Sequence, residues 1–128
     1  MTFTLAGRAL RPFDLGTLTL GQVQSLLRLM RRSGLHQVQL PDGSVDSAAL
    51  AILDHMVRAG VADDVFACFF LPAEAPCWSL ETESDVRHVL RDLSLPDQAV
   101  VFGQLAVLSH GLATGDWPKL RALAGGPT

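Results

Sequence analysis

The histidines and cysteines are the residues of this sequence best suited to metal binding or nucleophilic catalysis. No two of the four histidines have the i, i+3 or i+4 spacing that places side chains on one helix face. Cys68 and Cys77 are nine positions apart and form no CxxC pair. These spacings predict neither a metal site nor a disulfide, so both cysteines are expected to stay thiols, with Cys68 in the core. The histidines are His36, His55, His88 and His110.

Two fragments resemble parts of a hydrolase triad, but their geometry is unsuitable. Asp54 directly precedes His55, and Ser109 directly precedes His110. Adjacent helical residues point about 100° apart around the axis, so neither pair can hydrogen-bond as a nucleophile and its base do. The sequence has no GxSxG nucleophile elbow, and the carboxylates of residues 81–85 suit a helix start better than an acid–base pair. The sequence therefore predicts no catalytic residue and no cofactor.

Three arginines on one predicted helix face could grip phosphates. They are Arg28, Arg31 and Arg32, but the chain has a formal net charge of −3 and only one lysine, Lys119. No aromatic platform accompanies the arginines, and no GxxxxGK or GxGxxG loop occurs. The balance predicts that the protein binds neither nucleic acid nor nucleotides.

The composition is richer in apolar residues than so short a chain can bury. Hydrophobic residues make up 48% and charged residues 18% of 128 positions, against about 25% charged in an ordinary domain. Aromatic residues at helical spacing usually form a core, but this excess favours the alternative that some anchor another chain. The predicted partner-binding residues are Phe66, Phe69, Phe70, Trp78 and Trp117.

The elements that position these residues begin with a predicted β-hairpin over residues 1–13. Apolar and polar residues alternate there, and Ala6 and Gly7 supply the turn. Pro12 cannot donate to a ladder and is expected at an edge or just past the strand. A helix is predicted over residues 20–33, with a Thr19–Gln22 capping box before it and a glycine after it.

Further amphipathic helices are predicted over residues 46–59, 82–93 and 96–115, from their apolar spacing. In the second of these, Glu83 and Arg87 are expected to pair on the outer face. Residues 65–71 fit either a short helix ended by Pro72 or a buried strand, and the helix is favoured. Such a helix would be apolar on nearly all sides, as expected of a central core helix or of one with a face given to a partner. The fold class is thus mainly α with minor β: an N-terminal hairpin followed by a bundle of four to five helices. Residues 1–115 are expected to form one domain, and residues 116–128 a tail in which Trp117 docks.

No segment indicates export or a bilayer. Residues 1–5 lack the basic and then apolar order of a signal peptide. The longest uncharged apolar run, residues 65–73, is about half of the ~20 residues that a membrane span needs. We therefore expect a soluble protein of the cytoplasm, the host cytoplasm if the protein is viral, with no membrane partner.

Two stretches resemble a known family. FTLAGRALRPF followed by LGTLTLGQVQSLLRLM resembles the start of phage tail assembly chaperones, and QAVVFGQLAVLSHGL is similar to their closing helix. The resemblance covers residues 1–34 and, more weakly, residues 95–115. It implies a non-enzymatic helper that coats the tape-measure protein until tail tube subunits polymerise around it, and it brings no catalytic residues.

The leading hypothesis is thus an assembly chaperone that binds a tape-measure-like helical client through apolar surfaces and also forms homo-oligomers. The second is a structural or adaptor subunit of a viral or bacterial assembly, which would bury the same surface permanently. The third is a small enzyme whose site is assembled from His55, Cys68 and distant carboxylates.

Overall fold

The computed structural model describes residues 2–13, 18–40 and 43–125, and its first element is the predicted β-hairpin. Strand β1 (Phe3–Leu5) pairs with β2 (Arg8–Pro12) through a two-residue turn. Ala6 and Gly7 have φ values of 51° and 78°, and positive φ at both positions is the requirement of a type I′ turn. The predicted hairpin is confirmed.

A third strand, which the sequence left undecided, completes a small antiparallel sheet of order β1-β2-β3. The segment considered as helix or strand contains both, because α3 (Ala62–Phe69) runs directly into β3 (Phe70–Pro72). The favoured prediction of a helix over residues 65–71 is therefore wrong for its last two residues, Phe70 and Leu71. All three residues of β3 are buried, and pairing with β2 gives backbone groups in this apolar interior hydrogen-bond partners.

Helix α1 (Leu20–Ser33) has the predicted bounds and both predicted ends. The Thr19 hydroxyl accepts from the Gln22 amide, while the Gln22 side chain accepts from the Thr19 amide. Gly34 adopts the left-handed conformation, with φ of 73°, and its N–H donates to the Met30 carbonyl. Gln22 is also buried, and its Nε2 donates to the Cys68 carbonyl over 2.7 Å, so the capping residue links α1 to α3.

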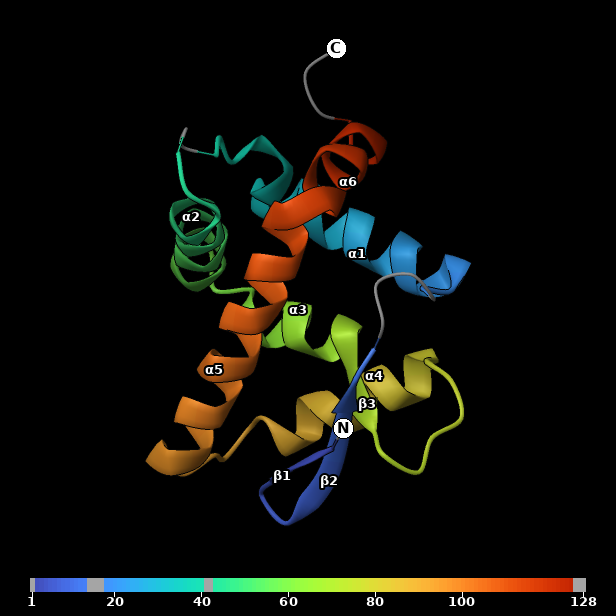
Figure 1. The fold of residues 1–128 in the computed structure, drawn as a ribbon. Coiled ribbons are helices and arrows are strands. Elements are labelled where there is room, and N and C mark those ends of the chain that lie inside the picture. Colours follow the sequence, from blue (N-terminus) through green and yellow to red (C-terminus); the bar gives the residue numbers. More distant parts are fainter. Residues whose placement is uncertain (1, 14–17, 41–42, 126–128) are drawn as a thin grey trace.

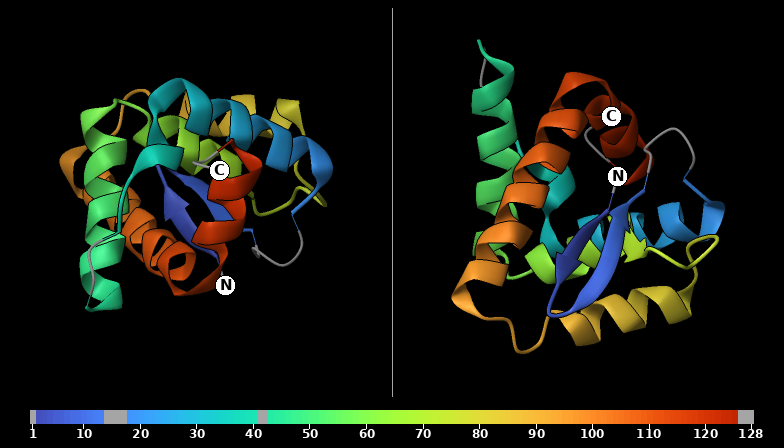
Figure 2. Two further views of the ribbon diagram at one scale, coloured as in Figure 1. Left: turned by 90° about the horizontal axis from the view of Figure 1, so that it is seen from above. Right: turned by 60° about the horizontal axis from the view of Figure 1, so that its bottom comes forward.

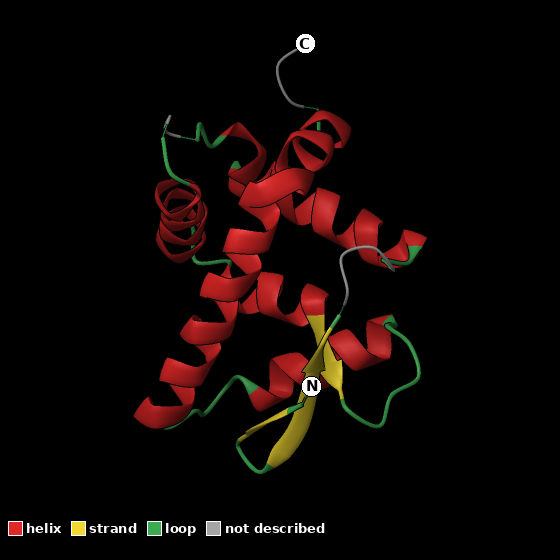
Figure 3. Cartoon of the chain, viewed as in Figure 1, coloured by secondary structure: helices red, strands yellow, loops and turns green. Residues whose placement is uncertain are grey.

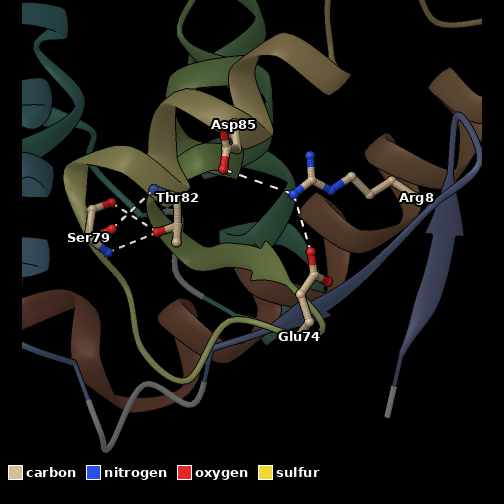
Figure 4. A network of polar contacts seen from close by, with 5 residues as sticks. All are labelled: Arg8, Glu74, Ser79, Thr82 and Asp85. Atoms are coloured by element: carbon tan, nitrogen blue, oxygen red, sulfur yellow. Dashed lines mark hydrogen bonds and ion pairs between the residues drawn. The ribbon is translucent and has the colours of Figure 1, made fainter.

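The remaining long helices are α2 (Val45–Arg58), α4 (Leu80–Val89) and α5 (Leu95–Gly111). Each begins at a serine whose side chain accepts from the backbone amide three residues later, and Figure 4 shows the capping box of α4. Helices α2 and α5 lie side by side (Figures 1 and 2), whereas α3 crosses the middle of the molecule and packs against α1, α4 and α5. Figure 3 makes the proportions plain: the fold is mainly α with minor β, as predicted.

Within the predicted C-terminal tail, residues 117–123 continue the chain as packed helix, while residues 126–128 lie outside the described residues. After α5, the π-helical η3 (Leu112–Asp116) leads into α6 (Trp117–Leu123). Leu120 and Ala124 are buried in the core. The Arg31 guanidinium donates to the carbonyls of Ala124 over 3.0 Å and Leu123 over 3.2 Å. A long-range cap that no local pattern reveals thus secures the end of α6.

The core lies between the sheet, α3 and the inner faces of the surrounding helices. Helix α3 is apolar on nearly all sides, and its burial fits the first of two predicted uses, a central core helix rather than one with a face given to a partner. The largest fully buried side chains of the core include Phe66, Phe69, Leu5, Leu10, Met30, Ile52, Met56, Leu71 and Leu105.

Candidate functional site

The three phenylalanines predicted to bind a partner lie in the core. Phe66, Phe69 and Phe70 are 0%, 1% and 2% exposed. The rings of Phe66 and Phe70 stack with centroids 4.1 Å apart, and Phe3 of the hairpin meets both edge-on. As a correction to the sequence-based assignment, these rings stabilise the single chain and offer no accessible anchor to another protein.

Of the two tryptophans in the predicted set, the structure describes the side chain of Trp78 only. Trp78 is buried, and its ring packs closely over Gly21 at the start of α1, where an added Cβ would lie 3.2 Å from the ring. It therefore also serves the fold of the single chain. Trp117 begins α6, and its side chain lies outside the described part of the structure.

Several exposed apolar side chains lie where α2 and α5 run side by side, whereas Leu20, Leu80 and Leu123 are exposed on other helices. Leu50 is 66% exposed and Val107 is 69% exposed, in contrast to the fully buried Ile52 and Leu105 on the inner faces of the same helices. We call this surface the α2–α5 seam. Its residues are Leu50, Leu53 and Val57 of α2 and Phe102, Ala106 and Val107 of α5.

Two hollows follow one another along the α2–α5 seam. The first has a volume of about 450 Å³ and is lined by Asp46, Ala49, Leu50, Leu53, Ala106, Val107 and His110. The second, of about 320 Å³, is lined by Val57, Gly60, Ala62, Asp63, Leu90, Leu93, Gln98, Val101 and Phe102. Leu53 and Val57 are four residues apart, as are Phe102 and Ala106, so the hollows adjoin within one helical turn.

The sequence contains one sign of this surface, a long stretch of α5 without charge. From residue 98 to residue 109, α5 carries no charged side chain, so whichever face it turns outward must be largely apolar. Leu50 and Val57 likewise lie off the buried stripe of α2, which consists of Ala48, Ala49, Ile52 and Met56. Exposed apolar patches of this kind are typical of protein-binding surfaces.

The predicted Glu83–Arg87 pair forms, but Glu83 is buried rather than on the outside. Glu83 is 6% exposed, and Arg87 pairs with it and with Asp64 of α3, the latter over 3.2 Å. Arg32 of α1 reaches the other oxygen of Asp64, also over 3.2 Å. These ion pairs connect three helices beside a polar hollow of about 400 Å³. The cluster is thus a structural junction between α1, α3 and α4.

The arginines considered as a phosphate grip have separate uses. Arg31 caps α6, and Arg32 pairs with Asp64, while Arg28 is exposed beside the polar hollow. Two of the three guanidinium groups are therefore engaged within the chain.

A second polar network fastens the tip of the hairpin. Arg8 Nη2 lies 3.3 Å from the Glu74 carboxylate and 4.0 Å from the Asp85 carboxylate (Figure 4). All three side chains are at least 40% exposed, and exposed pairs of this kind contribute about 0–1 kcal/mol. The network orients the hairpin against α4.

Of the residues of the alternative enzyme site, Cys68 is poorly suited to act as a nucleophile. Burial raises the pKa of the Cys68 thiol from its ordinary 9.0 to about 12, with a further increase from the Glu83 carboxylate. The thiolate that nucleophilic chemistry needs is therefore disfavoured. His55 Nε2 lies 2.9 Å from the Ser33 carbonyl, with which it forms a hydrogen bond. In the described ranges, no three His, Cys, Asp or Glu side chains are grouped to hold a metal ion.

We expect the two cysteines to differ sharply in reactivity. In the folded chain at pH 7.5, iodoacetamide should modify the exposed Cys77 and leave Cys68 intact, because Cys68 is buried and its pKa is raised. Mass spectrometry should find one adduct on the native chain and two after denaturation. Two adducts on the native chain would contradict the burial of Cys68.

The same raised pKa gives a pH dependence whose sign is fixed. Above about pH 9 the unfolded chain loses the Cys68 proton, whereas the folded chain keeps it up to about pH 12. The free energy of unfolding should therefore fall as the pH rises from 9 towards 12. Urea unfolding at pH 7, 9 and 10 measures this, and Cys68→Ala should show a shallower decline. Few other groups interfere, since the chain has no tyrosine and one lysine.

Among the helices of the described residues, none is both long and apolar enough to cross a membrane. Comparisons with protein-family models, with curated protein sequences and with solved structures found no match to this chain. The α2–α5 seam is therefore the feature on which a proposal of function rests.

Proposed function

We propose that this chain is a non-enzymatic assembly chaperone that binds a tape-measure-like helical protein through the α2–α5 seam. The observation that carries the proposal is the exposure of apolar side chains along two neighbouring helices, with Leu50 and Val107 each about two-thirds exposed. Exposure of such side chains to water is unfavourable, and burying them against a partner is favourable by about 25 cal/mol per Å² of apolar surface. A large apolar surface that the fold leaves uncovered is best explained by a partner that covers it.

The character of the seam suits reversible binding. Its six residues carry no hydrogen-bonding side chain, so binding depends on apolar contact rather than on a strict polar pattern. Such contact tolerates varied client sequences. The chaperone dissociates when a better-fitting surface, such as that of the polymerising tube, displaces it from the client. The resemblance of the hairpin and of α1 to phage tail assembly chaperones supports this function and names the client class.

Self-association and permanent incorporation into a particle are the competing uses of the same surface. A homo-oligomer through the seam would compete with the client, and light scattering on the purified chain measures its extent. A structural subunit would appear in purified particles at fixed stoichiometry.

The experimental test is co-expression with a phage tape-measure protein, the client class that the proposal names. The wild-type chain should keep the client in the soluble fraction. Leu50→Asp should reduce the soluble client at least about tenfold, because it places a carboxylate against the apolar side chain of the client. The measurement is the client's soluble fraction after centrifugation, normalised to chain expression.

Leu80→Asp is the matched control, since Leu80 is 69% exposed but lies outside the seam. It introduces the same charge at an equally exposed leucine and should preserve the client's solubility. Equal loss with both variants, or no loss with Leu50→Asp in a folded chain, would remove the seam from the mechanism.

A further inference from the structure

Resting on the proposed function, we propose that the occupant of the α2–α5 seam is one amphipathic helix of the partner. This helix has large apolar side chains at positions i and i+7 and basic residues beside each of them. The geometry of the two hollows gives the spacing, and the carboxylates that line them give the charge.

The spacing follows from the position of the hollows along α2. Leu50 lines the first hollow and Val57 the second, seven residues further on. Seven residues of helix span about 10.5 Å, which is also the distance between side chains i and i+7 of a partner helix lying alongside. Leu53 and Ala106, between the two positions, face the side chain at i+3 or i+4. A third helix laid along two neighbouring helices packs by the ordinary rules of a bundle.

The charge follows from the groups at the two ends of the seam. Asp46, whose side chain is 89% exposed, lines the first hollow, and the exposed Asp63 lines the second. His110 Nε2 lies 3.5 Å from Asp46 and neutralises it only when protonated. No lysine or arginine lines either hollow in the described part of the chain. Lysine or arginine beside each apolar anchor of the partner therefore complements the seam.

A second copy of this chain fits the seam less well. Its own seam would bring the same two carboxylates to face those of the first copy, again without a lining lysine or arginine. Like charges placed together in an interface oppose association. The basic helix α1 of a second copy cannot occupy the seam either, because its apolar residues Leu26, Leu29 and Met30 are buried in the core of that copy.

Designed peptides test the proposal directly. Three fluorescein-labelled peptides of about 18 residues, long enough for marginal helicity, are titrated with the full chain and followed by anisotropy. One has leucines at i, i+3 and i+7 flanked by lysines, one has glutamates in place of the lysines, and one scrambles the first. The lysine peptide should bind at least about tenfold more tightly than the other two, and added salt should narrow the difference from the glutamate peptide.

Substitutions in the chain give the complementary test. The double variant Asp46→Lys with Asp63→Lys changes exposed residues only, and it should reverse the preference so that the glutamate peptide binds more tightly. Leu50→Asp should remove binding of both peptides, whereas Leu80→Asp should leave it unchanged.

Three results would overturn the inference, and each is distinguishable from failure of the proposed function. Equal affinity for the lysine and glutamate peptides would exclude charge recognition. Absence of peptide binding while the wild-type chain still solubilises its client would exclude a helical occupant but leave the chaperone function standing. A dimer in sedimentation velocity that Leu50→Asp dissociates, and that excludes the peptides, would make a second copy the occupant.

Discussion

Phe66→Ala is expected to lower the free energy of unfolding by about 3–5 kcal/mol, the range for deleting a buried phenyl ring. Phe66 is 0% exposed, stacks on Phe70 and meets the edge of Phe3, so its removal leaves a cavity where α3 joins the sheet. A domain of ordinary stability has about 5–15 kcal/mol in total, so the loss is a large part of it. Urea unfolding followed by circular dichroism measures the change.

Phe102→Ala provides the comparison. Phe102 is 44% exposed in the α2–α5 seam, and its truncation should cost less than about 1.5 kcal/mol because no closed cavity forms. Under the proposed function, the same substitution should also weaken client binding, which Phe66→Ala should affect only through loss of the folded state. Equal destabilisation by the two variants would contradict the assignment of Phe66 to the core and Phe102 to the surface.

Arg87→Ala is expected to destabilise the chain by about 3 kcal/mol, although Arg87 itself is half exposed. The cost comes from the partner left behind. Glu83 is buried, its Oε2 already has no hydrogen-bond donor in the described structure, and the substitution removes the group that pairs with the carboxylate. Asp64 loses one of its two arginines at the same time. Chemical unfolding at pH 7 measures the loss.

A double-mutant cycle separates the orphaned charge from lost packing. In Glu83→Gln the ion pair is absent but no carboxylate is buried. If the orphaned charge is the main cost, Arg87→Ala should be much less harmful in that background than in the wild type. Additive effects of the two substitutions would show that Glu83 and Arg87 are not coupled, against the contact between them.

The parts of the fold that the sequence predicts correctly depend on partners close together in the chain. The capping box of Thr19 and Gln22 and the turn at Ala6 and Gly7 involve residues at most three positions apart. Strand β3 was not predicted with the same success, because its partner β2 lies about sixty residues earlier. The cap of α6 by Arg31 bridges more than ninety residues and has no local signal.

The sequence did not locate the exposed apolar side chains of the α2–α5 seam. The composition indicates an apolar surface in excess of what one core can hold, and the structure has such a surface. The prediction that the aromatic cluster of α3 is that surface is wrong, because these rings are buried in the core. A high density of aromatic residues does not by itself distinguish the centre of a fold from its exterior. The outward face of α5 depends on which helices cover the opposite face, and only tertiary packing decides that. The sequence also places Glu83 on the outside, because charged residues are rarely buried unless paired. Its pairing with Arg87 allows it to be buried.

The two-sided apolar character of α5 has a consequence for how the protein can change over time. The inward residues, such as Val101 and Leu105, must pack in the core, whereas the outward residues, such as Ala106 and Val107, are not constrained by core packing. Substitutions on the outer side should therefore cost little stability. Under the proposed function, helix α5 separates selection for folding from selection for recognition, and the outer face can change without rebuilding the interior.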